Sequence, residues 1–137
     1  SALAREAALA ITPVVGPEII AGSTRMKAGT ATKLVLNMIS TAVMIRLGYV
    51  YGNLMVNVRP VNSKLAARAR RIIRTAAGVD ESQAAELLEQ AAGDVRVAIL
   101  MARRRLPREE AERLLARAGG RLSEALGFCS GVDTQVG

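Results

Sequence analysis

The sequence RMKAGTATKLVLNMISTAVMIRL, residues 25–47, predicts one long helix that ends at Gly48. Its apolar residues fall on nearly every face, which is typical of a helix buried in a core or an interface. A chain of 137 residues has little other material to surround such a helix. We therefore expect it to pack against something outside this chain, either a partner subunit or another part of the protein. The apolar run from Leu34 to Ile45 is shorter than the ~20 residues that span a bilayer, so we expect no membrane partner.

The residues before this helix predict a strand and two loops. Residues 8–12, Ala-Leu-Ala-Ile-Thr, form a short apolar run that can be a buried strand. Gly16-Pro17 is a breaker pair and predicts a loop. A second loop follows, in which Ser23 or Thr24 can cap the long helix through a side-chain oxygen.

The residues after it predict a bundle of short helices. Residues 49–58 are apolar but broken by Gly52-Asn53, so loop, strand and helical turn all stay open. From residue 63 onward, apolar residues recur at helical spacing in four runs, and glycine follows the first, second and fourth of them. The expected signals at the ends of these runs are a capping box at Asp80 and Gln83, a cap at Asp94, Pro107 in a first turn, and glycines at 78, 93, 119 and 120.

Charge and composition divide the chain and exclude several functions. Residues 1–62 are apolar and poor in charge, whereas residues 63–126 carry many charges of mixed sign, so we place a domain boundary near Asn62. Residues 127–137 have no period, and we expect them to be disordered. The net charge of +7 favours anionic partners, but the arginines alternate with acidic residues, so we expect no nucleic-acid partner. No histidine is present, which excludes a histidine-dependent triad.

A single cysteine, Cys129, excludes an internal disulfide and a cysteine-cluster zinc site, and it has no neighbouring base to make it a catalytic thiol. We expect no metal and no cofactor. The N-terminal residues show no secretory signal. Together with the expected absence of a membrane span, this favours a cytoplasmic protein.

The densest polar cluster is Gly22-Ser-Thr-Arg-Met-Lys27, at the start of the long helix. Free backbone N–H groups and the helix dipole favour an anion there, and two hydroxyls and two cations join them. A phosphate or carboxylate site and simple helix capping are equally compatible with the spacing. Glu18 precedes the cluster and can act as a general base, accept a sugar hydroxyl, or, as we favour, pair with Arg25 or Lys27.

Two further polar groups have an ordinary structural interpretation. Asn62 and Lys64 precede a helix, which favours a cap and a solvated lysine. Arg103-Arg-Arg105 ends a helix, where cations complement the dipole on a solvated face.

Residues 16–37, GPEIIAGSTRMKAGTATKLVLN, resemble the signature of N-acetylmuramic acid 6-phosphate etherases. The stretches Met44–Gly48, Val50–Met55 and Asn62–Leu65 continue the resemblance, which covers about residues 4–126. It implies a mostly helical piece of an α/β protein: residues 1–62 would end a sugar isomerase (SIS) sandwich, and residues 63–126 would form a helical domain similar to ubiquitin-associated (UBA) domains. It further implies that the chain corresponds to roughly the C-terminal half of the family's chain. Separately, the apolar helix at residues 25–47 favours a homodimer.

The resemblance implies removal of the D-lactyl ether from N-acetylmuramic acid 6-phosphate, giving N-acetylglucosamine 6-phosphate and D-lactate by elimination and addition of water. No metal or organic cofactor is implied, and the pathway would be bacterial cell-wall sugar recycling. The family's acid/base glutamates lie in the N-terminal half, so no catalytic residue is assigned here. The substrate-binding residues that the resemblance implies are Ser23, Thr24, Arg25, Lys27 and Lys64.

Two alternatives use the same residues differently. The glucokinase regulatory protein, which carries a related signature, suggests a non-catalytic sugar-phosphate sensor. The chain can also be a helical interaction module, in which residues 63–126 fold alone and the first segment serves only assembly.

Overall fold

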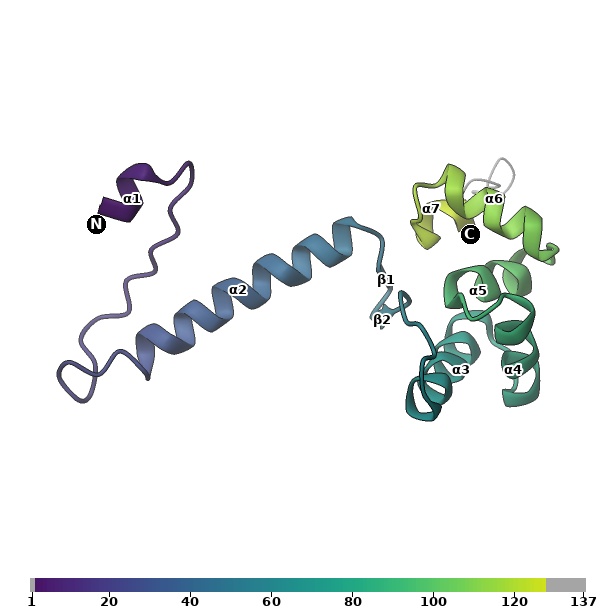
Figure 1. Cartoon of the computed structure of the whole chain (residues 1–137), viewed down its shortest axis with the longest axis horizontal. Coiled ribbons are helices and arrows are strands. Elements are labelled where there is room, and N and C mark those ends of the chain that lie inside the picture. The colour runs from purple at the N-terminus through teal and green to yellow at the C-terminus, as the bar shows by residue number, and fades with distance from the viewer. Residues whose placement is uncertain (1, 128–137) are drawn as a thin grey trace, which may run out of the picture. The chain divides into compact units, whose positions relative to one another are not determined.

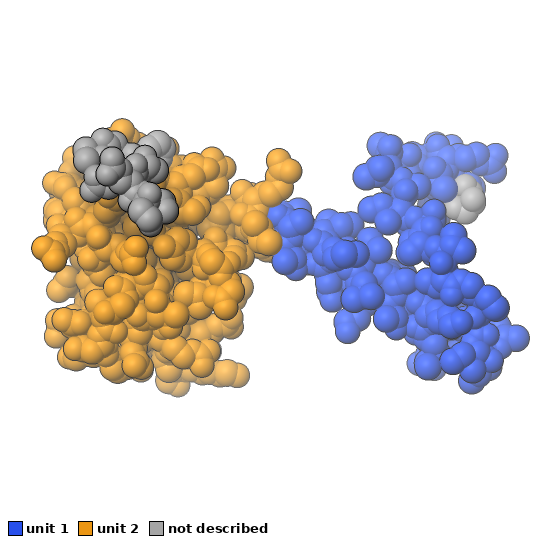
Figure 2. All heavy atoms as spheres, turned by 180° about the vertical axis from the view of Figure 1, so that it is seen from behind, with its two compact units in different colours: residues 1–43 blue, residues 44–137 orange. Residues whose placement is uncertain are grey.

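The structure, a computed structural model, describes residues 2–127 and forms two compact units. Residues 1–43 make the first unit and residues 44–137 the second, coloured separately in Figure 2. Cys129 lies outside the described residues. So does the segment predicted to be disordered, except for Gly127, which is the last residue of a helix.

The first unit consists of two helices joined by residues without regular structure. Helix α1 spans Ala2–Glu6 and helix α2 spans Lys27–Arg46 (Figure 1). The strand predicted at residues 8–12 is wrong, because those residues form no ladder and their side chains are exposed. An isolated strand leaves its backbone groups unpaired, and the first unit offers no second strand to pair with it.

Helix α2 confirms the predicted long helix and its end at Gly48. The Tyr49 N–H donates to the Met44 carbonyl at 3.0 Å, and the Gly48 N–H donates to the Ile45 carbonyl at 3.0 Å. With a φ of 78° at Gly48, this is the Schellman arrangement that closes a helix in a left-handed residue. No residue of α2 is buried, so the first unit does not provide the cover expected for its apolar faces.

The second unit begins with a hairpin that settles the ambiguity of residues 49–58. Strand β1, Val50–Tyr51, pairs antiparallel with β2, Leu54–Met55. Gly52 takes a φ of 58° at the first turn position, where a two-residue hairpin favours glycine. The segment after β2 then enters the core through Val56 and Val58.

Five helices follow the hairpin, and their ends match the predicted signals. They are α3 Ser63–Ala77, α4 Glu81–Gln90, α5 Val95–Arg104, α6 Arg108–Arg117 and α7 Leu122–Gly127. Asp80 and Gln83 form the expected capping box, and Asp94 accepts from the N–H groups of the first turn of α5. Pro107 is the N-cap residue, one position before the predicted first turn. Helix α7 is an addition to the four predicted runs.

The core of the second unit is built from small and aliphatic side chains of all five helices and of the segment after β2. Helix α5 is central to it, because it contacts α3, α4, α6 and α7. Its largest fully buried members are Ile73, Ile99, Leu100, Leu122, Val56 and Val95. The second compact unit begins at Met44, and its core includes Val56 and Val58. The domain boundary near Asn62 stays a prediction. The change in charge density along the sequence reflects a change in the composition of the surface. The hairpin, in contrast, is held to the helices by the burial of apolar side chains.

An ion pair joins the first two helices of the bundle. Glu81 accepts from Arg70 Nε at 2.7 Å and from Arg74 Nη1 at 3.2 Å. The hydrogen bond from Arg70 holds the pKa of the Glu81 carboxyl below its usual range. A carboxyl with a lowered pKa in the folded state adds stability that is present above its unfolded pKa and is lost on acidification.

We expect Glu81→Gln to lower the stability of the bundle slightly at neutral pH and to flatten its decline as the pH falls through the lowered pKa. The measurement is the free energy of urea unfolding between neutral and acidic pH. Glu86→Gln, on the exposed side of the same helix and outside the described ion pairs, should keep the wild-type pH dependence. Parallel pH profiles for wild type and Glu81→Gln would contradict the prediction.

Candidate functional site

The polar loop, which we define as residues 22–27, lies directly before and at the start of α2. Ser23 is half-buried, and Thr24, Arg25 and Lys27 are exposed. The Ser23 N–H donates to the Ile20 carbonyl at 3.1 Å, which makes a turn, and Gly22 has a φ of 81°. Four of the five predicted substrate-binding residues therefore occupy one short loop.

Glu18 caps α2, and this corrects two expectations. Its two carboxylate oxygens accept from the N–H groups of Lys27 and Ala28, each at 3.0 Å. Neither Ser23 nor Thr24 supplies a side-chain cap. Glu18 also forms no ion pair with Arg25 or Lys27 among the described residues. A carboxylate is well suited to this place because it satisfies two orphan donors and faces the positive end of the helix dipole.

The free backbone donors expected at the start of α2 are already occupied. Besides the two N–H groups bound by Glu18, the Gly29 N–H donates to the Thr24 carbonyl at 3.0 Å and the Thr30 N–H to the Met26 carbonyl at 3.1 Å. The prediction of free helix N–H groups for an anion is therefore wrong. The sequence pattern could not show it, because the cap comes from nine residues upstream.

Side chains remain available in the polar loop. Among residues 2–127, no hydrogen bond or ion pair engages the Arg25 guanidinium or the hydroxyls of Ser23 and Thr24. Lys27 differs, because its ammonium donates to the Pro17 carbonyl at 2.9 Å. The loop therefore offers the Arg25 guanidinium and two hydroxyls without a described partner, and a Lys27 ammonium that uses one of its three donors. This set suits a phosphate or carboxylate.

Lys64 lies in the other unit, in the first turn of α3, where its side chain is exposed. The helix cap predicted at Asn62 is confirmed, because Asn62 Oδ1 accepts from the Leu65 N–H at 2.8 Å. Of the three arginines that end α5, Arg103 and Arg105 are exposed as expected. Arg104 instead donates to the Leu126 carbonyl of α7.

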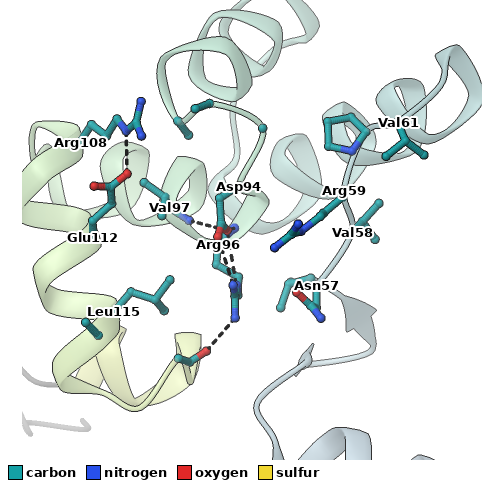
Figure 3. Close-up of a pocket in the computed structure, with 17 residues that line it drawn as sticks. Asn57, Val58, Arg59, Val61, Asp94, Arg96, Val97, Arg108, Glu112 and Leu115 are labelled. Atoms are coloured by element: carbon teal, nitrogen blue, oxygen red, sulfur yellow. Dashed lines mark hydrogen bonds and ion pairs between the residues drawn. The ribbon is translucent and has the colours of Figure 1, made fainter.

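The second unit carries a groove that the sequence did not predict (Figure 3). It has a volume of about 660 Å³ and is lined by the segment after β2, the turn before α5, and helix α6. Two of its arginines are paired: Arg96 with Asp94 at 3.1 Å and Arg108 with Glu112 at 2.6 Å. Arg59 also lines the groove and makes no described ion pair.

The groove was missed because its walls come from segments far apart in the sequence. Its two carboxylates are held by arginines, so they are poorly placed for acid/base work. Across residues 2–127, no cluster of three or more potential metal ligands occurs.

Within the described chain, α2 is also the one helix with the length and mean hydropathy of a bilayer span, although core helices of soluble proteins share both properties. The expectation of no membrane partner rested on the 12-residue run alone. The helix has 20 residues, so that length argument does not hold.

Comparison with known proteins gives a consistent result. No family model matches the chain. It is 54% identical over 120 residues to N-acetylmuramic acid 6-phosphate etherase 1 of Enterococcus faecalis, which covers 88% of this chain and 40% of the relative. It is 51% identical to the etherase of Oenococcus oeni and 54% identical to that of Pectobacterium atrosepticum, each over 126 residues. These matches cover 92% of this chain and 42% of each relative, so the chain spans about two-fifths of their length.

Proposed function

We propose that this chain is the C-terminal part of an N-acetylmuramic acid 6-phosphate etherase. The observation that carries the proposal is the identity of 51–54% over about nine-tenths of the chain to proteins of that name. Sequence identity at this level over 120 residues or more reflects common ancestry.

The proposed reaction is cleavage of the D-lactyl ether of N-acetylmuramic acid 6-phosphate. A base removes the proton on carbon 2, an acid assists the departure of lactate, and water then adds to the unsaturated sugar. The acid and base are glutamates supplied by the protein outside residues 1–137. The product, N-acetylglucosamine 6-phosphate, would return to amino sugar metabolism in the cytoplasm.

The architecture fits this assignment. In the proposal, the first unit contributes to a SIS sandwich, and the rest of that sandwich or a second subunit of a homodimer covers α2. The bundle of α3–α7 is the UBA-like domain. The exposed apolar side chains of α2 support this interpretation, because a helix apolar on nearly every face needs a cover. Five polar residues of α2, namely Thr30, Thr32, Asn37, Ser40 and Thr41, favour a protein core over a bilayer.

The test of the proposed function is release of D-lactate from N-acetylmuramic acid 6-phosphate. The natural protein that carries this sequence should release lactate, and residues 1–137 alone should release none. If the natural protein binds the phosphosugar without releasing lactate, the regulator alternative replaces the etherase. If it neither binds nor cleaves, both assignments fail.

Arg25 is the residue we expect to contribute most to phosphate binding, because it is the unpaired cation of the polar loop. Arg25→Ala in the natural protein should weaken phosphosugar binding about 10- to 100-fold, since a hydrogen bond to a charged group is worth about 1.5–3 kcal/mol. The measurement is KM for lactate release. Arg5→Ala, at an exposed position in α1, is the matched control and should leave KM unchanged. An unchanged KM in Arg25→Ala would remove Arg25 from the site.

A further inference from the structure

Glu18 closes the polar loop on itself. Residues 7–26 have no regular structure, and after Glu18 the chain turns at Ile20–Ser23 before α2 starts at Lys27. The carboxylate joins the two ends of this excursion through two hydrogen bonds of 3.0 Å. In a third bond, Lys27 Nζ donates to the Pro17 carbonyl at 2.9 Å, so the Lys27 side chain joins the same two ends.

These three bonds hold the base of the loop. The groups that form them are backbone groups, the Glu18 carboxylate and the Lys27 ammonium. The groups left unpaired, on Ser23, Thr24 and Arg25, all lie between the two fixed ends. Holding both ends of a short segment limits the conformations of the residues between them, and a preorganised loop loses less entropy when a ligand binds.

We propose that Glu18 is a positioning residue, which fixes the polar loop so that Ser23, Thr24 and Arg25 can bind the phosphate of the sugar together. This rests on the proposed function of the loop. It also assigns the anion to side chains, because Glu18 already occupies the first two N–H groups of α2. Glu18 itself does not touch the substrate in this scheme.

The test compares Glu18→Gln and Glu18→Ala in the natural protein that carries this sequence. Glutamine keeps one acceptor oxygen but presents an amide donor to the second N–H, whereas alanine removes both bonds. We expect Glu18→Ala to raise KM about tenfold or more while kcat stays within about twofold of wild type. Glu18→Gln should fall between the two, as a partial rescue. Glu6→Ala, at an exposed position in α1, is the control and should match wild type.

Amide hydrogen exchange at Lys27 and Ala28 provides a readout that does not depend on activity. Both variants should exchange faster than wild type at these two amides. Faster exchange with an unchanged KM would overturn the proposal and leave Glu18 a helix cap only. A fall in kcat at unchanged KM would also overturn it, because Glu18 would then act on the reacting atoms.

The proposed function can fail separately from this inference. If the wild-type protein releases no lactate, calorimetry with N-acetylglucosamine 6-phosphate replaces the kinetic assay. Weaker binding in Glu18→Ala than in Glu6→Ala supports positioning, and equal binding overturns it. If wild type does not bind this phosphosugar, the inference fails with the site.

Discussion

Gly48→Ala should destabilise the second unit by about 2–5 kcal/mol, from backbone strain and overpacking together. Gly48 is buried and has a φ of 78°, a conformation that costs an L-residue about 1–2 kcal/mol. A Cβ atom there would lie 2.5 Å from Cγ and 2.9 Å from Cα of Arg121. The second atom is backbone, so a change of side-chain rotamer cannot relieve the contact. The measurement is urea unfolding of the chain followed by circular dichroism.

The variant Gly78→Ala separates the cost of backbone strain from the cost of overpacking. Gly78 ends α3 with a φ of 71°, and a Cβ atom there meets nothing within 4 Å. Its replacement should cost only the backbone strain, about 1–2 kcal/mol. Equal losses in the two variants would show that the approach of Arg121 to Gly48 contributes nothing.

Ile73→Ala should lower the free energy of unfolding of the bundle by about 2–5 kcal/mol, the usual cost of a cavity in a packed core. Ile73 is 0% exposed and lies in the C-terminal half of α3. The matched variant is Ile39→Ala in α2, where the side chain is 46% exposed. In residues 1–137 alone, Ile39→Ala should change the bundle's unfolding very little.

The same pair also tests the missing cover of α2. In the natural protein, Ile39→Ala should become as costly as a core substitution, because the proposed sandwich or dimer would bury it. A small effect of Ile39→Ala in both proteins would show that this face of α2 stays exposed. A small effect of Ile73→Ala would contradict the packing of α3 in the core.

Local signals made the bundle predictable. The capping box at Asp80 and Gln83, the cap at Asp94 and the stop at Gly78 each depend on contacts within a few residues. The spacing of apolar residues in α3–α6 also depends only on the helical period. Such features depend on residues that are close in the sequence, and the structure confirms them. The one difference is that Pro107 is the N-cap residue of α6, one position before the predicted first turn.

Features that depend on distant residues were missed or wrong. The cap of α2 comes from Glu18, on the far side of a loop, so Ser23 and Thr24 were the nearer but incorrect choice. The groove joins residues from 56 to 120. The strand expected at residues 8–12 has an apolar pattern but no partner within its unit. The polar loop was found, because its hydroxyls and cations are contiguous in sequence.

The exposed apolar faces of α2 also matter during protein synthesis. Translation delivers α2 before the bundle, and the bundle joins short helices that are neighbours in sequence, so it can fold soon after it leaves the ribosome. The first unit, to which most of α2 belongs, buries no residue of this helix. In the proposed protein, the rest of the sandwich precedes α2 in synthesis and can bury the helix at once, whereas a second subunit can bury it only after assembly. If the second subunit provides the cover, we expect chains to bind chaperones through α2 until the subunits associate.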